Sequence, residues 1–141
     1  MPTILLTDDD SGVRAPLRRI LEDSGYEVVE AGGGEEALAL AAGRDGPIHL
    51  LLTDVVMPGL SGGELARKLG DSRPRMRILF MSGYSSEAVA TQGNLLPGAG
   101  FLAKPFSAVD LVARVRETLA APPPMPRGRI SPSTGERSRP R

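Results

Sequence analysis

The chain has 141 residues, of which 40 % are hydrophobic and 24 % are charged, and it contains no cysteine. The length suits one globular domain and excludes two large ones, and the absence of cysteine excludes disulfides and thiolate metal sites. No apolar run approaches the roughly 18 residues that span a bilayer, and the first residues lack a secretory signal, so we expect a cytoplasmic protein with no membrane partner.

The formal net charge of zero hides a difference between the two ends of the chain. Residues 1–120 contain 12 Lys and Arg against 16 Asp and Glu, a balance of −4, whereas residues 121–141 contain five Arg and one Glu, a balance of +4. Proline, arginine, serine and glycine dominate this second part, which cannot build a core. We therefore predict one domain over residues 1–120 and a disordered basic tail over residues 121–141.

Short apolar segments alternate with amphipathic ones along the predicted domain. The expected strands cover residues 3–7, 27–31, 48–54, 77–81 and 101–103. The expected helices cover residues from about 13 to 23, 35 to 42, 63 to 69, 85 to 91 and 108 to 119. This alternation predicts an α/β fold, in which right-handed crossovers build a doubly wound parallel sheet of five strands with helices on both faces.

Polar residues follow four of the five expected strands. In doubly wound sheets, ligands bind outside the carboxyl ends of the strands, near the point where the strand order reverses. This rule brings together the acidic run from Asp8 to Asp10, then Asp54, Ser82 and Lys104, from the first, third, fourth and fifth strands. Asp54 by itself would be a turn former or a helix cap. The convergence of the other groups favours a functional site instead.

The gathered side chains suit phosphoryl chemistry. Converging carboxylates repel one another and provide the oxygen ligands that Mg²⁺ prefers. A lysine and a hydroxyl opposite the metal suit a phosphoryl group, one as a charge and the other as a hydrogen-bond donor. With the charge neutralised in this way, one aspartate can act as nucleophile toward a phosphoryl donor. The residue types thus favour Mg²⁺-assisted aspartyl phosphorylation, without deciding which aspartate reacts.

Four stretches, in this order, carry a resemblance to a known family. They are Ile-Leu-Leu-Thr-Asp-Asp-Asp, Leu-Leu-Thr-Asp-Val-Val-Met-Pro-Gly-Leu-Ser-Gly, Ile-Leu-Phe-Met-Ser-Gly-Tyr and Phe-Leu-Ala-Lys-Pro-Phe. With them, residues 3 to about 120 resemble the receiver domains of two-component response regulators, and most of all those attached to the C-terminus of hybrid histidine kinases. The resemblance implies a flavodoxin-like fold of five βα units with strand order 2-1-3-4-5.

The resemblance also implies roles for the acidic residues. Asp54 takes the position of the phosphoacceptor. Mg²⁺ would be bound directly by Asp9, by Asp54 and by the backbone carbonyl of Val56, and through water by Asp8.

Other positions carry further implied roles. Lys104 matches the phosphate-binding lysine, and Ser82 matches the hydroxyl that follows the phosphoryl group. Phe101 takes the place of the aromatic side chain that turns inward when this hydroxyl moves. The peptide bond before Pro105 would be cis, an isomer that is accessible before proline.

The implied function is that of a phosphoacceptor in a two-component phosphorelay. A histidine kinase or a histidine phosphotransfer protein would phosphorylate Asp54, and the domain would catalyse only its own phosphorylation and dephosphorylation. The modification would change the surface of the fourth helix, fifth strand and fifth helix, where a downstream protein effector binds. No nucleic-acid partner is expected.

Two other functions remain open on the residues alone. Asp8 and Asp10 spell the Asp-x-Asp of haloacid-dehalogenase-like phosphatases, with Asp8 as nucleophile, although Asp54 would then have no role. The chain could also be a non-phosphorylated scaffold, or a binding module that acts through its basic tail. Asp10 is expected to be a helix-start acid rather than a metal ligand, and His49, the only histidine, a structural residue.

Overall fold

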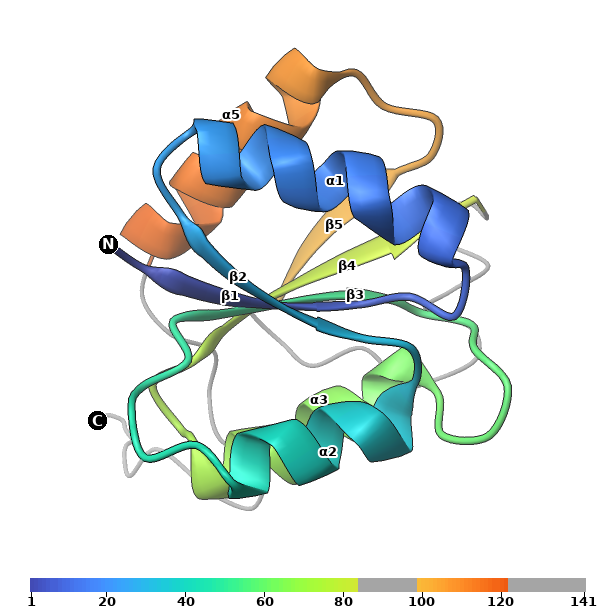
Figure 1. Cartoon of the computed structure of the whole chain (residues 1–141), viewed down its shortest axis with the longest axis vertical. Helices are drawn as coiled ribbons and strands as arrows, with labels where there is room; N and C mark the ends of the chain where they lie inside the picture. The colour runs from blue at the N-terminus through green and yellow to red at the C-terminus, as the bar shows by residue number, and fades with distance from the viewer. Residues whose placement is uncertain (84–98, 122–141) are drawn as a thin grey trace, which may run out of the picture.

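The computed structural model describes residues 1–83 and 99–121, and it contains a five-stranded sheet between two layers of helices (Figure 1). The strands are β1 (Thr3–Thr7), β2 (Glu27–Ala31), β3 (Leu50–Asp54), β4 (Arg77–Ser82) and β5 (Gly100–Ala103). The helices of the described residues are α1 (Ser11–Asp23), α2 (Gly34–Ala42), α3 (Gly62–Ser72) and α5 (Ala108–Ala120). The helix expected at 85–91 lies outside the described residues, as does all of the expected tail except Ala121.

The sheet has the predicted topology. Hydrogen-bonded neighbours follow the order β2-β1-β3-β4-β5, and all four neighbouring pairs are parallel. The predicted α/β class, the doubly wound sheet and the strand order 2-1-3-4-5 are therefore confirmed. The order reverses between β1 and β3, which is where a site is expected in this class of fold.

Different helix pairs cover the two faces of the sheet, because alternate residues of a strand point to opposite sides. Leu5 and Leu51 pack with α2 and α3, whereas Leu6, Leu50 and Leu52 pack with α1 and α5 (Figure 1). All five side chains are fully buried. A continuous apolar run such as the one in β3 thus supplies both cores, as is typical of a strand covered on both faces.

The third strand begins at Leu50, two residues later than the expected start at residue 48. The N–H of Thr3 donates to Nδ1 of His49 at 2.9 Å instead of to a backbone carbonyl, and Pro47 has no N–H to offer. The backbone of His49 still accepts from Arg77 and donates to Thr3. His49 therefore ties the starts of three strands together, which agrees with the predicted structural role.

Helix α3 extends beyond the expected residues 63–69 at both ends. At its start, Ser61 Oγ accepts the N–H of Glu64 at 3.2 Å, and Glu64 Oε1 accepts the N–H of Ser61 at 3.0 Å. This capping box begins the helix before Gly63, and its Ser-x-x-Glu signature was present in the sequence. At the other end, the helix continues to Ser72, and Arg73 is its C-cap. The helix stops there because a proline, here Pro74, disfavours a helical conformation in the residue before it.

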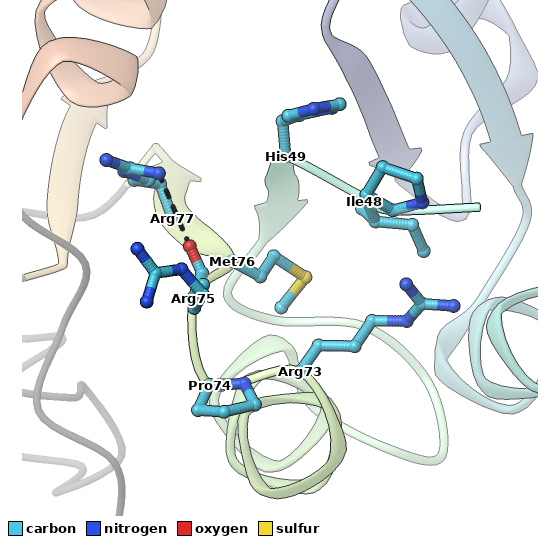
Figure 2. Close-up of a pocket in the computed structure, with 8 residues that line it drawn as sticks. Ile48, His49, Arg73, Pro74, Arg75, Met76 and Arg77 are labelled. Atoms are coloured by element: carbon cyan, nitrogen blue, oxygen red, sulfur yellow. Dashed lines mark hydrogen bonds between the residues drawn. The ribbon is translucent and has the colours of Figure 1, made fainter.

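Arginines satisfy the carbonyl groups at the edge of the sheet where α2 and α5 end. Arg73 donates to three carbonyls around the end of α2, at 3.0 to 3.1 Å: those of Ala41, Arg44 and Gly46. Arg77 donates to the carbonyl of Ala121 at 3.0 Å and, as Figure 2 shows, to that of Arg75. Terminal helix carbonyls lack intrahelical partners and carry partial negative charge. We therefore assign Arg73 and Arg77 a structural role, although they line a pocket of about 380 Å³.

Among the helices that the structure describes, none combines the length and the apolar character that a bilayer crossing needs.

Candidate functional site

The carboxyl ends of neighbouring strands bring the candidate residues to one edge of the sheet. Thr7 of β1 pairs with Thr53 of β3, so Asp8 and Asp54 follow paired residues. The N–H of Lys104 donates to the carbonyl of Ser82 at 2.8 Å, which aligns the end of β5 with the end of β4. The parallel register therefore produces the convergence that the sequence predicts.

Lys104 lies between two of the carboxylates. Its Nζ is 3.2 Å from Asp8 Oδ2 and 3.3 Å from Asp54 Oδ2. Asp9 joins this group, because Asp8, Asp9 and Asp54 each offer a carboxylate oxygen and the three oxygens lie within 4.8 Å of one another. Asp10 does not belong to the cluster: its Oδ1 accepts the N–H of Gly12 at 2.9 Å and caps α1, as expected of a helix-start acid.

The carboxylates of Asp8 and Asp54 differ in accessibility. The Asp8 side chain is only 2 % exposed, and both its oxygens are engaged, Oδ1 by the N–H of Asp10 at 2.9 Å and Oδ2 by Lys104. The Asp54 side chain is 16 % exposed, and Lys104 pairs with its Oδ2. Of these two carboxylates, Asp54 is therefore the better placed to meet a reactant from solvent.

The electrostatics of the site follow from this burial and crowding. Burial raises the pKa of Asp54; Lys104 opposes this effect, and the nearby Asp8 carboxylate adds to it. Burial by itself would lower the pKa of the Lys104 ammonium. The nearby carboxylates of Asp54 and Asp8 have the larger effect, so this pKa is raised. Three carboxylates beside one lysine leave an excess of negative charge, and a divalent cation would relieve it.

The donor set fits Mg²⁺. Its members are carboxylates, with no imidazole or thiolate among them, and Mg²⁺ prefers oxygen ligands. It keeps several waters and takes only one or two carboxylates directly, so a site open to solvent on one side is suitable. Asp9 provides that open side because it is exposed, whereas Asp8 is buried.

Gly62 holds the loop after β3 against the strand end. Its N–H donates to the carbonyl of Val55 at 2.8 Å. A Cβ at this position would stand 2.0 Å from the backbone oxygen of Asp54, a distance that no side chain permits. Only glycine therefore allows this close approach. The sequence predicts no such role for Gly62, and its sole signal there is a Gly-Gly pair at a helix start.

The remaining predicted residues lie around this cluster. Ser82 is 1 % exposed at the end of β4, where it pairs with Ala103. Phe101 is partly buried and packs against the core beneath α2 and α3. Val56 is 45 % exposed beside the site, and the peptide bond between Lys104 and Pro105 is cis.

Comparison with known proteins decides the family. The model of the response regulator receiver domain matches residues 4–116. The chain belongs to the response regulator receiver family. The match includes Asp8, Asp9, Asp54, Ser82 and Lys104, and it confirms the resemblance that the four sequence stretches carry.

Individual receiver proteins resemble the chain over most of its length. It is 38 % identical over 117 residues to the sensor kinase CckA of Brucella abortus, covering 83 % of the chain but only 12 % of that protein. It is 37 % identical over 121 residues to the response regulator receiver protein CpdR of Brucella abortus, covering 86 % of the chain and 99 % of that protein. The crystal structure of the receiver domain from the hybrid histidine kinase CckA superposes with a TM-score of 0.70 at 38 % identity, over 83 % of this chain and 98 % of the other.

Family membership establishes the general function. As a response regulator receiver domain, the chain is a phosphoacceptor module of two-component signal transduction. Such modules work with histidine kinases or phosphotransfer proteins, and they generally bind Mg²⁺ at an acidic pocket. The family is a signalling module rather than a conventional enzyme family.

Proposed function

We propose that Asp54 is the residue that receives the phosphoryl group from a histidine kinase or a histidine phosphotransfer protein. One observation carries this proposal: Lys104 Nζ lies within 3.3 Å of both Asp8 and Asp54 at the carboxyl ends of three strands. Asp54 is the more exposed of these two carboxylates, whereas both oxygens of Asp8 are already occupied. Of the two carboxylates that contact Lys104, the more accessible one is thus the candidate nucleophile.

In the proposed reaction, an Asp54 oxygen attacks the phosphorus of a phosphohistidine. The new O–P bond forms as the P–N bond breaks, and the electron pair of that bond returns to the donor imidazole. Lys104 supplies a positive charge to the transferring oxygens, and Ser82 supplies a hydroxyl to them at the end of β4. Mg²⁺ bound at the site would neutralise the charge of the phosphoryl oxygens. The domain would catalyse only this transfer to itself and the later loss of the group.

The proposed Mg²⁺ ligands are Asp9, Asp54 and the backbone carbonyl of Val56, with Asp8 holding the ion through water. The three clustered carboxylates support this assignment. The buried position of Asp8 also supports a water-mediated role, because its oxygens already bind Lys104 and a backbone N–H. The attachment of the loop through Gly62 supports a fixed position for Val56.

The proposed output is a change of surface near β5 and α5. Phosphorylation would draw the Ser82 hydroxyl toward Asp54 and let Phe101 turn inward, so that a downstream protein effector recognises the altered face. The part-buried position of Phe101 supports this role, since the side chain can exchange core contact for solvent. The domain limits of 1–120, the basic tail of 121–141 and the cytoplasmic location stay predictions from the sequence.

Titration with acetyl phosphate and with beryllofluoride, each with Mg²⁺, tests the phosphoacceptor assignment. Wild type should gain an aspartyl phosphate by mass spectrometry, and a beryllofluoride adduct by NMR, whereas Asp54→Asn should gain neither. Peptide mapping should place the acyl phosphate on Asp54. Phosphate trapped on Asp8 would instead support the phosphatase alternative, and an unresponsive wild type would indicate a non-phosphorylated scaffold.

A further inference from the structure

An arginine of α1 contacts the backbone of the acidic cluster. The guanidinium of Arg14 donates through one terminal nitrogen to the carbonyl of Asp8 at 2.6 Å, and its Nε donates to Glu30 Oε1 at 3.1 Å. The Arg14 side chain is only 17 % exposed. Gly32 leaves room for it, because a Cβ there would stand 3.3 Å from the terminal nitrogen. Arg14 thus connects the end of β1, the end of β2 and the first turns of α1.

The charge of Arg14 is already balanced within this network. Glu30 accepts from Arg14 through one oxygen and from Arg18 through the other, at 2.8 Å. Arg18 also pairs with Glu22 on the exposed side of the helix at 3.0 Å. Arg14 and Arg18 are therefore matched, since each is an α1 arginine bonded to Glu30. Arg18 is more exposed and has Glu22 as a second partner, and of the two only Arg14 contacts Asp8.

The contact with Asp8 matters for its neighbour. The carbonyl of Asp8 belongs to the rigid peptide plane that leads into Asp9, so a bond that fixes this carbonyl also fixes the positions of the Asp9 N and Cα, from which the side chain starts. Within the described residues, the Asp9 carboxylate has no hydrogen bond or ion pair of its own to orient it. Its direction toward the cluster therefore depends on the backbone.

We propose that Arg14 is a positioning residue for the Mg²⁺ site, which holds the peptide between Asp8 and Asp9 so that the Asp9 carboxylate points at the ion. This inference rests on the Mg²⁺ ligands of the proposed function. The guanidinium fork is suited to the task because it reaches the Asp8 carbonyl and Glu30 at once, with fixed geometry. A lysine can occupy one of these two sites but cannot span both.

Mg²⁺ titration by calorimetry, without any phosphoryl donor, tests the proposal on wild type, Arg14→Gln, Arg14→Lys and Arg18→Gln. Arg14→Gln should raise the Kd for Mg²⁺ about tenfold, the usual order for loss of a group that orients a metal ligand. Arg14→Lys should fall between this variant and wild type. Arg18→Gln should stay within about twofold of wild type, since Arg18 does not contact Asp8. Urea unfolding without Mg²⁺ measures the structural cost of each change separately.

The direction of the change in the Kd for Mg²⁺ distinguishes a positioning role of Arg14 from an effect of its charge alone. Removing a cation near the site should tighten Mg²⁺ binding if only long-range charge mattered, so weaker binding in Arg14→Gln requires the positioning role. An unchanged or lower Kd in Arg14→Gln, an equal change in Arg18→Gln, or a wild type that binds no Mg²⁺ would overturn the inference. If the Kd pattern holds but Asp54 is not phosphorylated, the proposed phosphoacceptor is wrong and the role of Arg14 stands.

Discussion

Replacement of Asp9 by asparagine should raise the free energy of unfolding of the domain when Mg²⁺ is absent. When Mg²⁺ is present, the variant should have a lower free energy of unfolding than wild type. Asp9 is exposed, and its carboxylate lies with those of Asp8 and Asp54 in a cluster whose oxygens are within 4.8 Å. Without a metal this proximity is repulsive, so removing one charge should favour the folded state. With Mg²⁺ the same carboxylate is a proposed ligand, and its loss should remove most of the stabilisation by the ion.

The distances allow the size of the effect to be worked out. At 4.8 Å, two unit charges repel by about 0.9 kcal/mol in water and by about 3.5 kcal/mol at an effective dielectric constant of about 20. The value in water is the better approximation because Asp9 is exposed. Lys104 also offsets part of the repulsion that Asp8 and Asp54 exert on Asp9. We expect Asp9→Asn to raise the free energy of unfolding by about 1 kcal/mol without metal. At Mg²⁺ about a hundredfold above its Kd, wild type should gain about 2.7 kcal/mol, which reverses the order.

Urea unfolding of both proteins, in EDTA and in saturating Mg²⁺, provides the assay. Asp10→Asn is the matched control: it removes the same charge one residue away, and asparagine still caps α1 well. The control should change stability by less than about 0.5 kcal/mol in either condition. Salt should reduce the gain of Asp9→Asn, because exposed charges are screened. A destabilised Asp9→Asn in EDTA, or an equal gain in Asp10→Asn, would refute the repulsion.

Three further predictions concern other parts of the domain. Gly62→Ala should lower the free energy of unfolding in urea by about 3 kcal/mol or more, because its Cβ would overlap a backbone oxygen at 2.0 Å. Gly70→Ala in the same helix, where a Cβ meets nothing within 4 Å, should instead add about 0.5–1 kcal/mol; a similar loss in both would contradict the close approach. Hydrogen bonds from two arginines lower the pKa of Glu30, so its contribution to stability is complete above the ordinary glutamate pKa of about 4.3 and disappears as the pH falls through the lower folded-state value. Glu30→Gln should therefore reduce the loss of stability as the pH falls below about 5, measured as the midpoint of thermal unfolding at several pH values. An unchanged dependence of this midpoint on pH would count against the network. Arg73→Met should cost about 2 kcal/mol in urea unfolding, since three carbonyls lose their donor, whereas Arg75→Met should stay within about 0.5 kcal/mol; equal costs would show that the helix-end contacts contribute nothing.

The sequence predicted the elements of the sheet well because burial on both faces leaves a clear record. Leu50, Leu51 and Leu52 form a continuous apolar run, and such a run can only be a covered strand or a buried helix segment. The bounds were less certain where a local bond decides them. The start of β3 depends on an imidazole that takes the N–H of Thr3, and the start of α3 depends on the capping box of Ser61 and Glu64.

By itself, the sequence determined the fold class, the strand order implied by the family resemblance, and the polar residues at the strand ends. Asp8, Asp54 and Lys104 could be placed together in advance, because parallel strands carry their carboxyl ends to one edge of the sheet. Only the tertiary structure decided that Asp54 is more accessible than Asp8, which glycine touches the strand end, and which arginine holds Asp8. The reason is physical: each of these contacts involves a backbone carbonyl or N–H, which every residue carries, so no side-chain pattern in the sequence marks it.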